Sequence, residues 1–428
     1  MPQPLPSPAA LRRRLGVADA VVVGLGAMLG AGVFAAFAPA AQAAGSGLLV
    51  GLVLAAFVAY CNATSSARLA ALYPESGGTY VYGRRRLGDF WGHQAGWAFI
   101  VGKIASAAAM ALTFASYAAP GHVRLGAVAA VVVLTAINYR GVQKSAWATR
   151  GIVALTLLTL GVVVVACLAG GQANAMRLSP FPGTGLRGIL QAAGLLFFAF
   201  AGYARIATLG EEVRDPARTI PRAIPIALGI ALAVYALVAV SALLAAGPTG
   251  LAGTTAPLRA AVMAGRLHAL APIVQVGGAA AALGALLSLI LGISRTTFAM
   301  ARDRHLPATL ARVHPRFGIP HHAEVAVGAL VVVLVCTVDL RGAIGFSSFG
   351  VLFYYAIANA AALTLTRAER APARWIPVAG LLGCATLAFS LPVPSIIGGV
   401  AALALGAAVW IVRGGGRNVR SGRSGATA

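Results

Sequence analysis

Two apolar stretches of the sequence are interrupted by glycines, and an interrupted helix exposes backbone groups that can bind a small charged molecule. The first stretch runs from Gly24 to Phe34 and reads GLGAMLGAGVF. The second runs from Phe197 to Tyr203 and reads FFAFAGY. A site built from free N–H and C=O groups needs few polar side chains, so the pattern indicates binding rather than covalent catalysis.

The depth of the first interruption supports this interpretation. Gly30 lies about 13 residues into its apolar stretch, or roughly 20 Å along a helix, near the centre of a bilayer. Free backbone groups are tolerated there only where protein, water or ligand satisfies them. Close helix packing is the alternative, because Gly26 and Gly30 also form a small-xxx-small pair. We favour interrupted helices, because the two interruptions would fall at equivalent positions if the chain consists of two repeats. A dinucleotide-binding loop is a separate alternative, and it fails because no strand precedes these glycines.

Two basic residues lie deep in apolar stretches, and no acidic residue does. Lys103 stands about 12 residues into the third predicted span, and Arg205 follows Gly202 by less than one turn. All ten acidic residues lie in predicted loops or near span ends. A cationic substrate near unpaired buried cations would meet repulsion, which favours a neutral or acidic substrate. Cation–π contact with Phe200 and Tyr203 keeps a cationic substrate open. An Arg205 side chain directed towards Glu212 would also weaken the argument against such a substrate.

Helices that cross a membrane have to position these residues. The 428 residues are 59% hydrophobic and 10% charged, with a mean hydropathy of +0.85, which leaves too little polar surface for a water-soluble globule. Apolar runs of about 20 residues can cross a bilayer, and about twelve recur here. The predicted spans are 17–43, 46–71, 92–119, 123–139, 149–170, 186–210, 221–246, 271–300, 322–338, 343–366, 373–391 and 393–412. The predicted fold class is an all-α membrane protein.

The distribution of Lys and Arg predicts the orientation, since cytoplasmic loops carry the excess of positive charge. With the amino terminus inside, inner segments hold about 23 basic residues and outer loops about 6. We therefore expect a multi-pass protein of the plasma (inner) membrane with both termini in the cytoplasm. Topology and anionic lipid headgroups also account for the net charge of +23, so no nucleic acid partner is expected.

Four stretches of the chain match motifs of a known family. They are Gly26–Phe34, Tyr73–Tyr82, Phe197–Tyr203 running on into Glu211–Ile224, and Ser294–Pro307. Over nearly its whole length the chain resembles the amino acid–polyamine–organocation family of permeases. The most specific match is the series Glu-Glu, Pro and Ile-Pro-Arg directly after a glycine-broken helix.

The resemblance implies two inverted repeats of five helices, with helices one and six broken, and two further helices at the carboxyl end. The corresponding divisions are a cytoplasmic tail 1–15, a first repeat 16–170, a second repeat 186–366, a helix pair 373–412 and a cytoplasmic tail 413–428. Alternating access around a site at the middle of the membrane follows from this architecture.

The resemblance and helix electrostatics together predict how a substrate binds. The outer half of the first span is expected to begin just past Gly32, so that N–H groups of Ala31, Gly32 and Val33 would hold a carboxylate. Carbonyl groups at the end of the outer half of span six would accept hydrogen bonds from an ammonium group. The predicted pocket walls are Phe198, Phe200, Ala201, Gly202 and Tyr203, with Phe200 similar to the gating aromatic of the family. Ordinary helix packing is the alternative role for these aromatic residues.

An inner gate is predicted in the loop after span six. Glu211 and Glu212 would fix that gate against Arg214, Arg218 or Arg222. A solvated charge cluster without a gating role is the alternative.

Coupling to an ion is predicted from the alignment with the family. Many members that use protons carry a lysine in span five, where this chain has Thr156. Lys103 can supply the missing charge from span three, because an ionisable residue at that depth is functional by default. A structural lysine bonded to backbone carbonyls is the alternative. Sodium coupling through the hydroxyls of Thr156 and Ser288 also stays open.

The predicted function is secondary active transport of a neutral or acidic amino acid, with proton coupling; a cationic amino acid or polyamine transporter or antiporter is the alternative. The nearly uncharged spans do not offer the pore lining of a channel. No HExxH or GxSxG motif indicates an enzyme. No cofactor or metal is expected, because the cysteines and histidines lack ligand spacing. The expected partners are an amino acid or amine, the lipid bilayer and a coupling ion, a proton before sodium.

Overall fold

The computed structural model describes residues 15–75, 77–141, 146–182, 185–207, 209 and 212–413. These residues form seventeen α-helices and no strands. The first nine helices are α1 Val17–Met28, α2 Ala31–Ala35, α3 Phe37–Ala44, α4 Leu48–Leu72, α5 Thr79–Leu87, α6 Asp89–Ala118, α7 Val123–Tyr139, α8 Ala146–Ala169 and α9 Leu186–Phe200. The others are α10 Ala204–Ala207, α11 Pro216–Ala252, α12 Pro257–Met263, α13 Ala271–Arg302, α14 His321–Thr337, α15 Leu340–Leu363, α16 Trp375–Ser390 and α17 Val393–Val412.

The predicted all-α membrane fold is confirmed. Within the described ranges ten helical stretches are long and apolar enough to cross a membrane, and α14 and α16 are shorter apolar helices. Most predicted spans agree with observed helices within a few residues. Helix α11 begins at Pro216, before the predicted start at 221, and a kink at Gly247, where φ is +70°, interrupts it next to the predicted end at 246. The short helices α5 and α12 were not predicted, because neither is long enough to span a bilayer.

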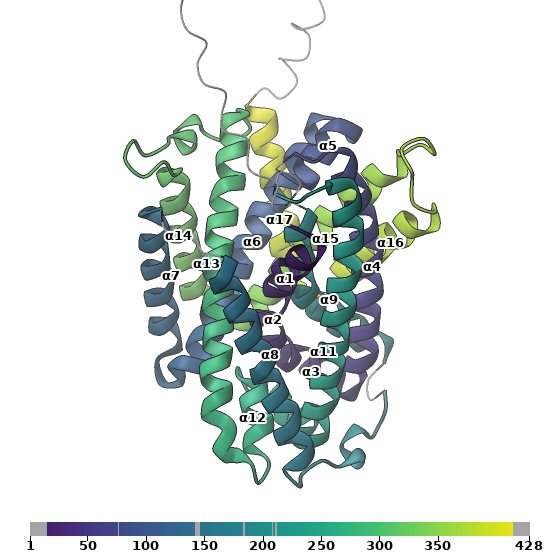
Figure 1. Ribbon diagram of the computed structural model, residues 1–428, viewed down its shortest axis with the longest axis vertical. Helices are drawn as coiled ribbons and strands as arrows, with labels where there is room; N and C mark the ends of the chain where they lie inside the picture. The colour runs from purple at the N-terminus through teal and green to yellow at the C-terminus, as the bar shows by residue number, and fades with distance from the viewer. Residues whose placement is uncertain are drawn as a thin grey trace, which may run out of the picture.

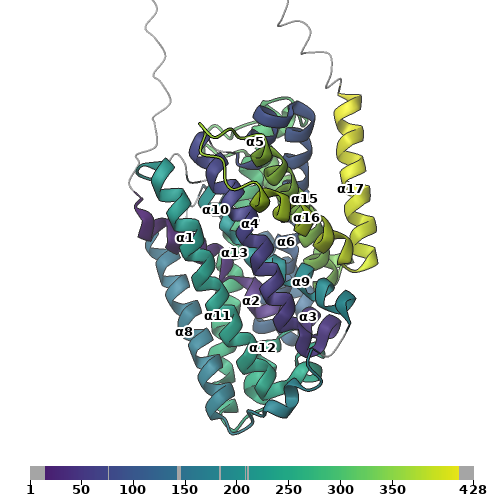
Figure 2. The ribbon, with the colours of Figure 1, turned by 90° about the vertical axis from the view of Figure 1, so that its right-hand side faces the viewer.

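The helices form one bundle in which α6 is central. In the most apolar part of α6, 83% of the residues are buried, whereas in that of α17 only 17% are. Figure 1 and Figure 2 both place α5 and the carboxyl-terminal end of α17 at the top of the bundle and α12 at the bottom. We call the top the arginine-rich end, because it carries Arg84, Arg85 and Arg86 of α5.

Close contacts between glycines and serines explain why α6 can be so deeply packed against α15. A Cβ added at Gly102 would lie 3.3 Å from the Cα atom of Gly350, so the two backbones are almost in contact. One turn further, the hydroxyls of Ser106 and Ser347 share a hydrogen bond of 2.6 Å. Small residues and hydroxyls hold helices together in lipid, where the hydrophobic effect cannot.

Three side chains on α6 fasten α17 to it. The indole N–H of Trp97 donates to the Ala402 carbonyl at 2.7 Å. The Gln94 amide donates to the Leu403 carbonyl at 3.4 Å, and Nε2 of His93 lies 3.0 Å from the Gly406 carbonyl. These carbonyls already take part in helix hydrogen bonds, so the side chains use their second lone pairs.

Candidate functional site

The predicted break in the first span is present. Helix α1 ends at Met28 and α2 begins at Ala31, and Gly30 between them has φ −82° and ψ −140°. The N–H groups at the start of α2 have no carbonyl one turn before them in a regular helix. The new helix therefore begins at Ala31, slightly earlier than the position past Gly32 that the sequence indicated.

The second break has a different form. Helix α9 ends at Phe200, as predicted, and a 3₁₀ turn over Ala201–Tyr203 follows it. The next helix, α10, has only four residues, Ala204–Ala207. A change from α to 3₁₀ hydrogen bonding frees carbonyl groups at the end of α9.

The two breaks cross each other in direct backbone contact. A Cβ at Gly32 would lie 2.7 Å from the Cα atom of Ala199, just before the second break. A Cβ at Gly202 would lie 2.4 Å from the carbonyl of Ala27, just before the first break. Both approaches are too close for any side chain, so glycine is required at both positions. Gly30 also packs tightly, since its Cβ would lie 2.8 Å from the Ala285 Cβ, and the glycines thus serve helix packing as well.

Three tyrosine hydroxyls bond the carbonyls that the breaks release. Tyr235 of α11 lies 2.5 Å from the Met28 carbonyl and 3.0 Å from the Ala199 carbonyl. Tyr355 of α15 donates to the Ala201 carbonyl at 3.3 Å. Tyr117 of α6 donates to the Phe34 carbonyl at 2.9 Å. A hydroxyl has one proton, so Tyr235 can serve only one of its two carbonyls at a time.

The sequence analysis did not identify these tyrosines, although a single tyrosine within an apolar run indicates a buried hydroxyl that needs a partner. Tyr235 stands alone in the run ALGIALAVYALVAV, and a tyrosine buried in an apolar helix usually finds a hydrogen-bond partner. Nothing in the local sequence says which carbonyl that partner is.

The predicted pocket aromatics are all buried, and two of them pack against tyrosines. The ring of Phe200 meets Tyr235 edge-on at 5.1 Å, and Tyr203 stacks on Tyr355 at 4.9 Å. Phe198 is 7% exposed. In this conformation the rings close over the crossing of the breaks rather than lining an open path.

The structure separates the two deep cations. Arg205 follows the second break, its side chain is 47% exposed, and it pairs with Glu212 at 3.9 Å. Glu212 thus pairs with Arg205 and not with Arg214, Arg218 or Arg222. Arg218 pairs with Asp215, at 3.6 Å. This pairing removes Arg205 from the argument against a cationic substrate. Glu211 lies outside the described residues.

Lys103 lies in the middle of α6 and forms no ion pair within the part of the chain that the structure describes. It comes seven residues after Gly96, and residues seven apart share one face of a helix. Gly96 packs on Met300 of α13 and on Tyr80. Lys103 therefore lies on the face of α6 that is turned toward α13.

The hydroxyls proposed for sodium bond within their own helices. Thr156 is buried and donates to the Ile152 carbonyl at 2.8 Å. Ser288 is exposed and donates to the Gly284 carbonyl at 3.0 Å. No contact between the two hydroxyls joins α8 to α13 in the described residues.

Backbone pairing closes the arginine-rich end around the first helix. The Leu15 N–H donates to the Glu212 carbonyl at 3.1 Å, and the Arg214 N–H donates to the Leu15 carbonyl at 2.9 Å. Arg150 of α8 bonds Asp19 of α1 at 2.5 Å. The start of α1 is thus tied both to the segment after α10 and to α8.

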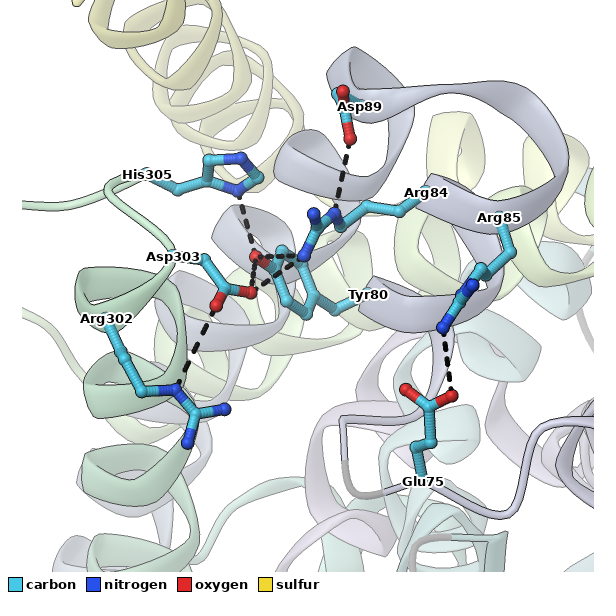
Figure 3. Close-up of polar contacts among 8 residues, drawn as sticks. All are labelled: Glu75, Tyr80, Arg84, Arg85, Asp89, Arg302, Asp303 and His305. Carbon is cyan, nitrogen blue, oxygen red and sulfur yellow. Dashed lines mark hydrogen bonds and ion pairs between the residues drawn. The ribbon is translucent and has the colours of Figure 1, made fainter. Parts of the chain in front are cut away.

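A second network at this end joins two of the motif stretches, as Figure 3 shows. The Tyr80 hydroxyl donates to Oδ2 of Asp303 at 2.7 Å, and Nη1 of Arg84 donates to the same oxygen at 2.8 Å. Nε of Arg84 also bonds Asp89 at 3.3 Å. Nδ1 of His305 lies 3.0 Å from the Tyr80 hydroxyl. The network clamps α5 to the end of α13.

Proton positions in this network follow from its chemistry. Because Tyr80 gives its proton to Asp303, His305 Nδ1 has to donate to the Tyr80 oxygen. Burial, with His93 and Arg84 nearby, lowers the pKa of the His305 imidazole to about 4, so the ring is neutral near pH 7. The neutral tautomer with its proton on Nδ1 satisfies the network.

Comparison with known proteins identifies the family. The model of the amino acid permease family matches residues 15–415. The chain belongs to this family. An uncharacterized transporter of Mycobacterium tuberculosis is 64% identical over 406 residues, which cover 95% of this permease and 92% of the relative.

More distant relatives carry substrate names. The branched-chain amino acid permease BcaP of Bacillus subtilis is 27% identical over 389 residues, covering 84% of this permease and 82% of the relative. The human cationic amino acid transporter 4 is 28% identical over 391 residues, covering 85% and 61% of the two chains. The family and these relatives are transporters, so this permease is a multi-pass membrane transporter.

Replacing Tyr235 by phenylalanine should destabilise the permease. The change keeps the ring that contacts Phe200 but leaves the Met28 and Ala199 carbonyls without their donor, at a cost of about 1–3 kcal/mol. Thermal unfolding in detergent measures the effect. Tyr60→Phe is the matched control, because Tyr60 is 42% exposed. Equal melting temperatures for the two variants would contradict the role of the hydroxyl.

Replacing Asp303 by asparagine should loosen the network of Figure 3. Tyr80 and Arg84 would lose a charged acceptor, and we expect a loss of about 1–2 kcal/mol in the free energy of unfolding. Arg302→Gln serves as the control, since Arg302 is 70% exposed and only 4.0 Å from Asp303. Chemical unfolding of the purified variants separates them. The proposed clamp fails if Asp303→Asn is as stable as the control.

Proposed function

We propose that this permease moves an amino acid by alternating access around the crossing of α1–α2 with α9–α10. The observation that carries the proposal is the mutual contact of the two breaks, Gly32 on Ala199 and Gly202 on Ala27. The crossing brings the N–H groups at the start of α2 near the carbonyl groups at the end of α9. Opposite partial charges at one place suit the carboxylate and ammonium groups of an amino acid.

The substrate's carboxylate would accept hydrogen bonds from the N–H groups of Ala31, Gly32 and Val33. Its ammonium group would donate to carbonyls at the end of α9. The Ala199 carbonyl is one acceptor that Tyr235 leaves free when it bonds Met28. Phe198, Phe200 and Tyr203 would then have to move from their present packing to admit the side chain.

The proposal includes a topology. The arginine-rich end would face the cytoplasm of the plasma membrane with both termini, as the distribution of basic residues favours. Residues 16–170 and 186–366 would form inverted repeats, with α1–α2 equivalent to α9–α10. The tie between Leu15, Glu212 and Arg214 would then be part of an inner gate.

A neutral or acidic substrate is favoured, with proton coupling through Lys103. Lys103 is a cation on the α13-facing side of α6 and has no acidic partner among the described residues, so it would repel a cationic side chain. The relative from Bacillus subtilis is named a branched-chain amino acid permease, which supports a substrate with a neutral side chain. A cationic substrate remains the second candidate, because Arg205 is compensated by Glu212 and a human relative is named a cationic amino acid transporter.

Competition for uptake tests the substrate class. Purified permease in liposomes should take up a labelled neutral amino acid, and unlabelled leucine, alanine or glutamate should compete with it. Lysine and putrescine should not compete, because of repulsion by Lys103. Inhibition by lysine or putrescine alone would establish the cationic alternative. If no amino acid or amine is taken up, the proposed function is wrong.

Separately imposed ion gradients test the coupling. A pH gradient, acidic outside, should drive accumulation, and Lys103→Gln should lose that response while it still exchanges labelled for unlabelled substrate. Exchange needs the binding site but not the driving ion, so it is the internal control. Accumulation driven by a sodium gradient at constant pH would rule out the role of Lys103 and return attention to Thr156.

A further inference from the structure

Glu324 is the one buried carboxylate in the part of the chain that the structure describes. It lies in the first turn of α14 and is only 1% exposed. Its sequence position near a span end gave no sign of this burial. A carboxylate taken out of water is strongly unfavourable unless it is paired or takes up a proton.

The surroundings of Glu324 leave one of its two carboxylate oxygens without a hydrogen-bond donor. Its side chain lies beside Asn138 of α7 and Ser294 of α13. The Asn138 amide already donates to the Leu287 carbonyl at 3.4 Å, and the Ser294 hydroxyl donates to the Leu291 carbonyl at 3.0 Å. Oε1 of Glu324 and Oδ1 of Asn138 are both buried and without a hydrogen-bond partner. Binding of one proton by Glu324 would supply the hydrogen-bond donor that these two oxygens lack.

Among the described residues, Arg295 of α13 is the charged side chain that acts on the Glu324 carboxylate. Arg295 is exposed, and it also lies within range of Arg205, the residue that follows the second break. Arg205 in turn pairs with Glu212. A chain of charges therefore connects Glu324 to the segment that closes over α1.

The other titratable groups at the start of α14 in the described residues are imidazoles, and Arg312 of the preceding loop acts on one of them, His321. α7, α6, α13 and the 3₁₀ turn Ala308–Ala311 pack on α14, and α7 lies beside it in Figure 1. From the preceding loop and from α14 itself, the rings of His314 and His321 pack on Tyr139, at 5.6 and 6.2 Å. His322 bonds the Thr309 carbonyl through Nδ1 at 3.0 Å. These imidazoles lie at the arginine-rich end and offer a route for protons from water.

We propose that Glu324 is a proton-binding site that controls the closure of the arginine-rich end through Arg295 and Arg205. Proton uptake removes the negative charge that compensates Arg295. The repulsion between Arg295 of α13 and Arg205 of α10 then rises, which favours displacement of α10 from its packing on α1. Loss of the proton restores compensation and favours closure. The pH on this side, the cytoplasmic side in the proposed topology, would thereby regulate transport without being the driving gradient.

Infrared difference spectroscopy on the detergent-solubilised permease tests the site without any transport assay. Lowering the pH should produce the C=O stretching band of a protonated carboxylic acid, and Glu324→Gln should lack that band. Arg295→Gln should keep it, because the carboxyl group is unchanged. An identical band in Glu324→Gln would overturn the proposal. If Glu324→Gln does not fold, Ser294→Ala provides the test. Its band should appear at a different pH from that of the wild type, because Ser294 lies beside the carboxylate, and an unshifted band would count against the site.

The regulatory role rests on the proposed function and is tested in liposomes at constant external pH. Exchange of substrate by the wild type should change by about threefold or more as the internal pH is varied, since a shift of that size needs only a small change in the gate equilibrium. Glu324→Gln and Arg295→Gln should both become insensitive to internal pH while retaining exchange. A wild-type pH profile in either variant would overturn the regulatory role. Absence of exchange in every protein, with the infrared band intact, would instead refute the proposed function.

Discussion

The structure depends on one constraint, that a backbone group freed inside a membrane has to find a partner within the protein. Breaking the first and sixth spans frees carbonyls at Met28, Ala199 and Ala201. Tyr235 of α11 bonds either of the first two, and Tyr355 of α15 bonds the third. The helices that bear these tyrosines must therefore pack directly on the breaks. Two glycines then bring the breaks into backbone contact with each other.

The breaks were predictable because their cause is local. A glycine-rich run in the middle of an apolar stretch signals lost helix hydrogen bonds, and both breaks occur where the sequence places them, at Gly30 and after Phe200. Span positions follow equally from hydropathy. The start of α11 was placed too late because its first turn, which includes Arg218, is not apolar and so carries no hydropathy signal.

The partners of the breaks were not predictable, because they are distant in sequence. Tyr235 and Met28 are 207 residues apart, and Tyr80 and Asp303 are 223 apart. The burial of Glu324 likewise depends on α7 and α13, which the local pattern does not contain. For Glu212 the sequence offered two sets of partners, the arginines on its carboxyl side and Arg205 before it, and the structure pairs it with Arg205.

The attachment of α17 to α6 has a consequence for how motion in this permease can be observed. Three side chains of α6 hold carbonyls over more than one turn of α17, so the outermost helix is joined firmly to the innermost one. A rearrangement that swings α1 and α10 would leave α17 behind with α6. The end of α17 is therefore a natural fixed reference: a spectroscopic label attached there, paired with one on α1, would report the displacement of α1 alone.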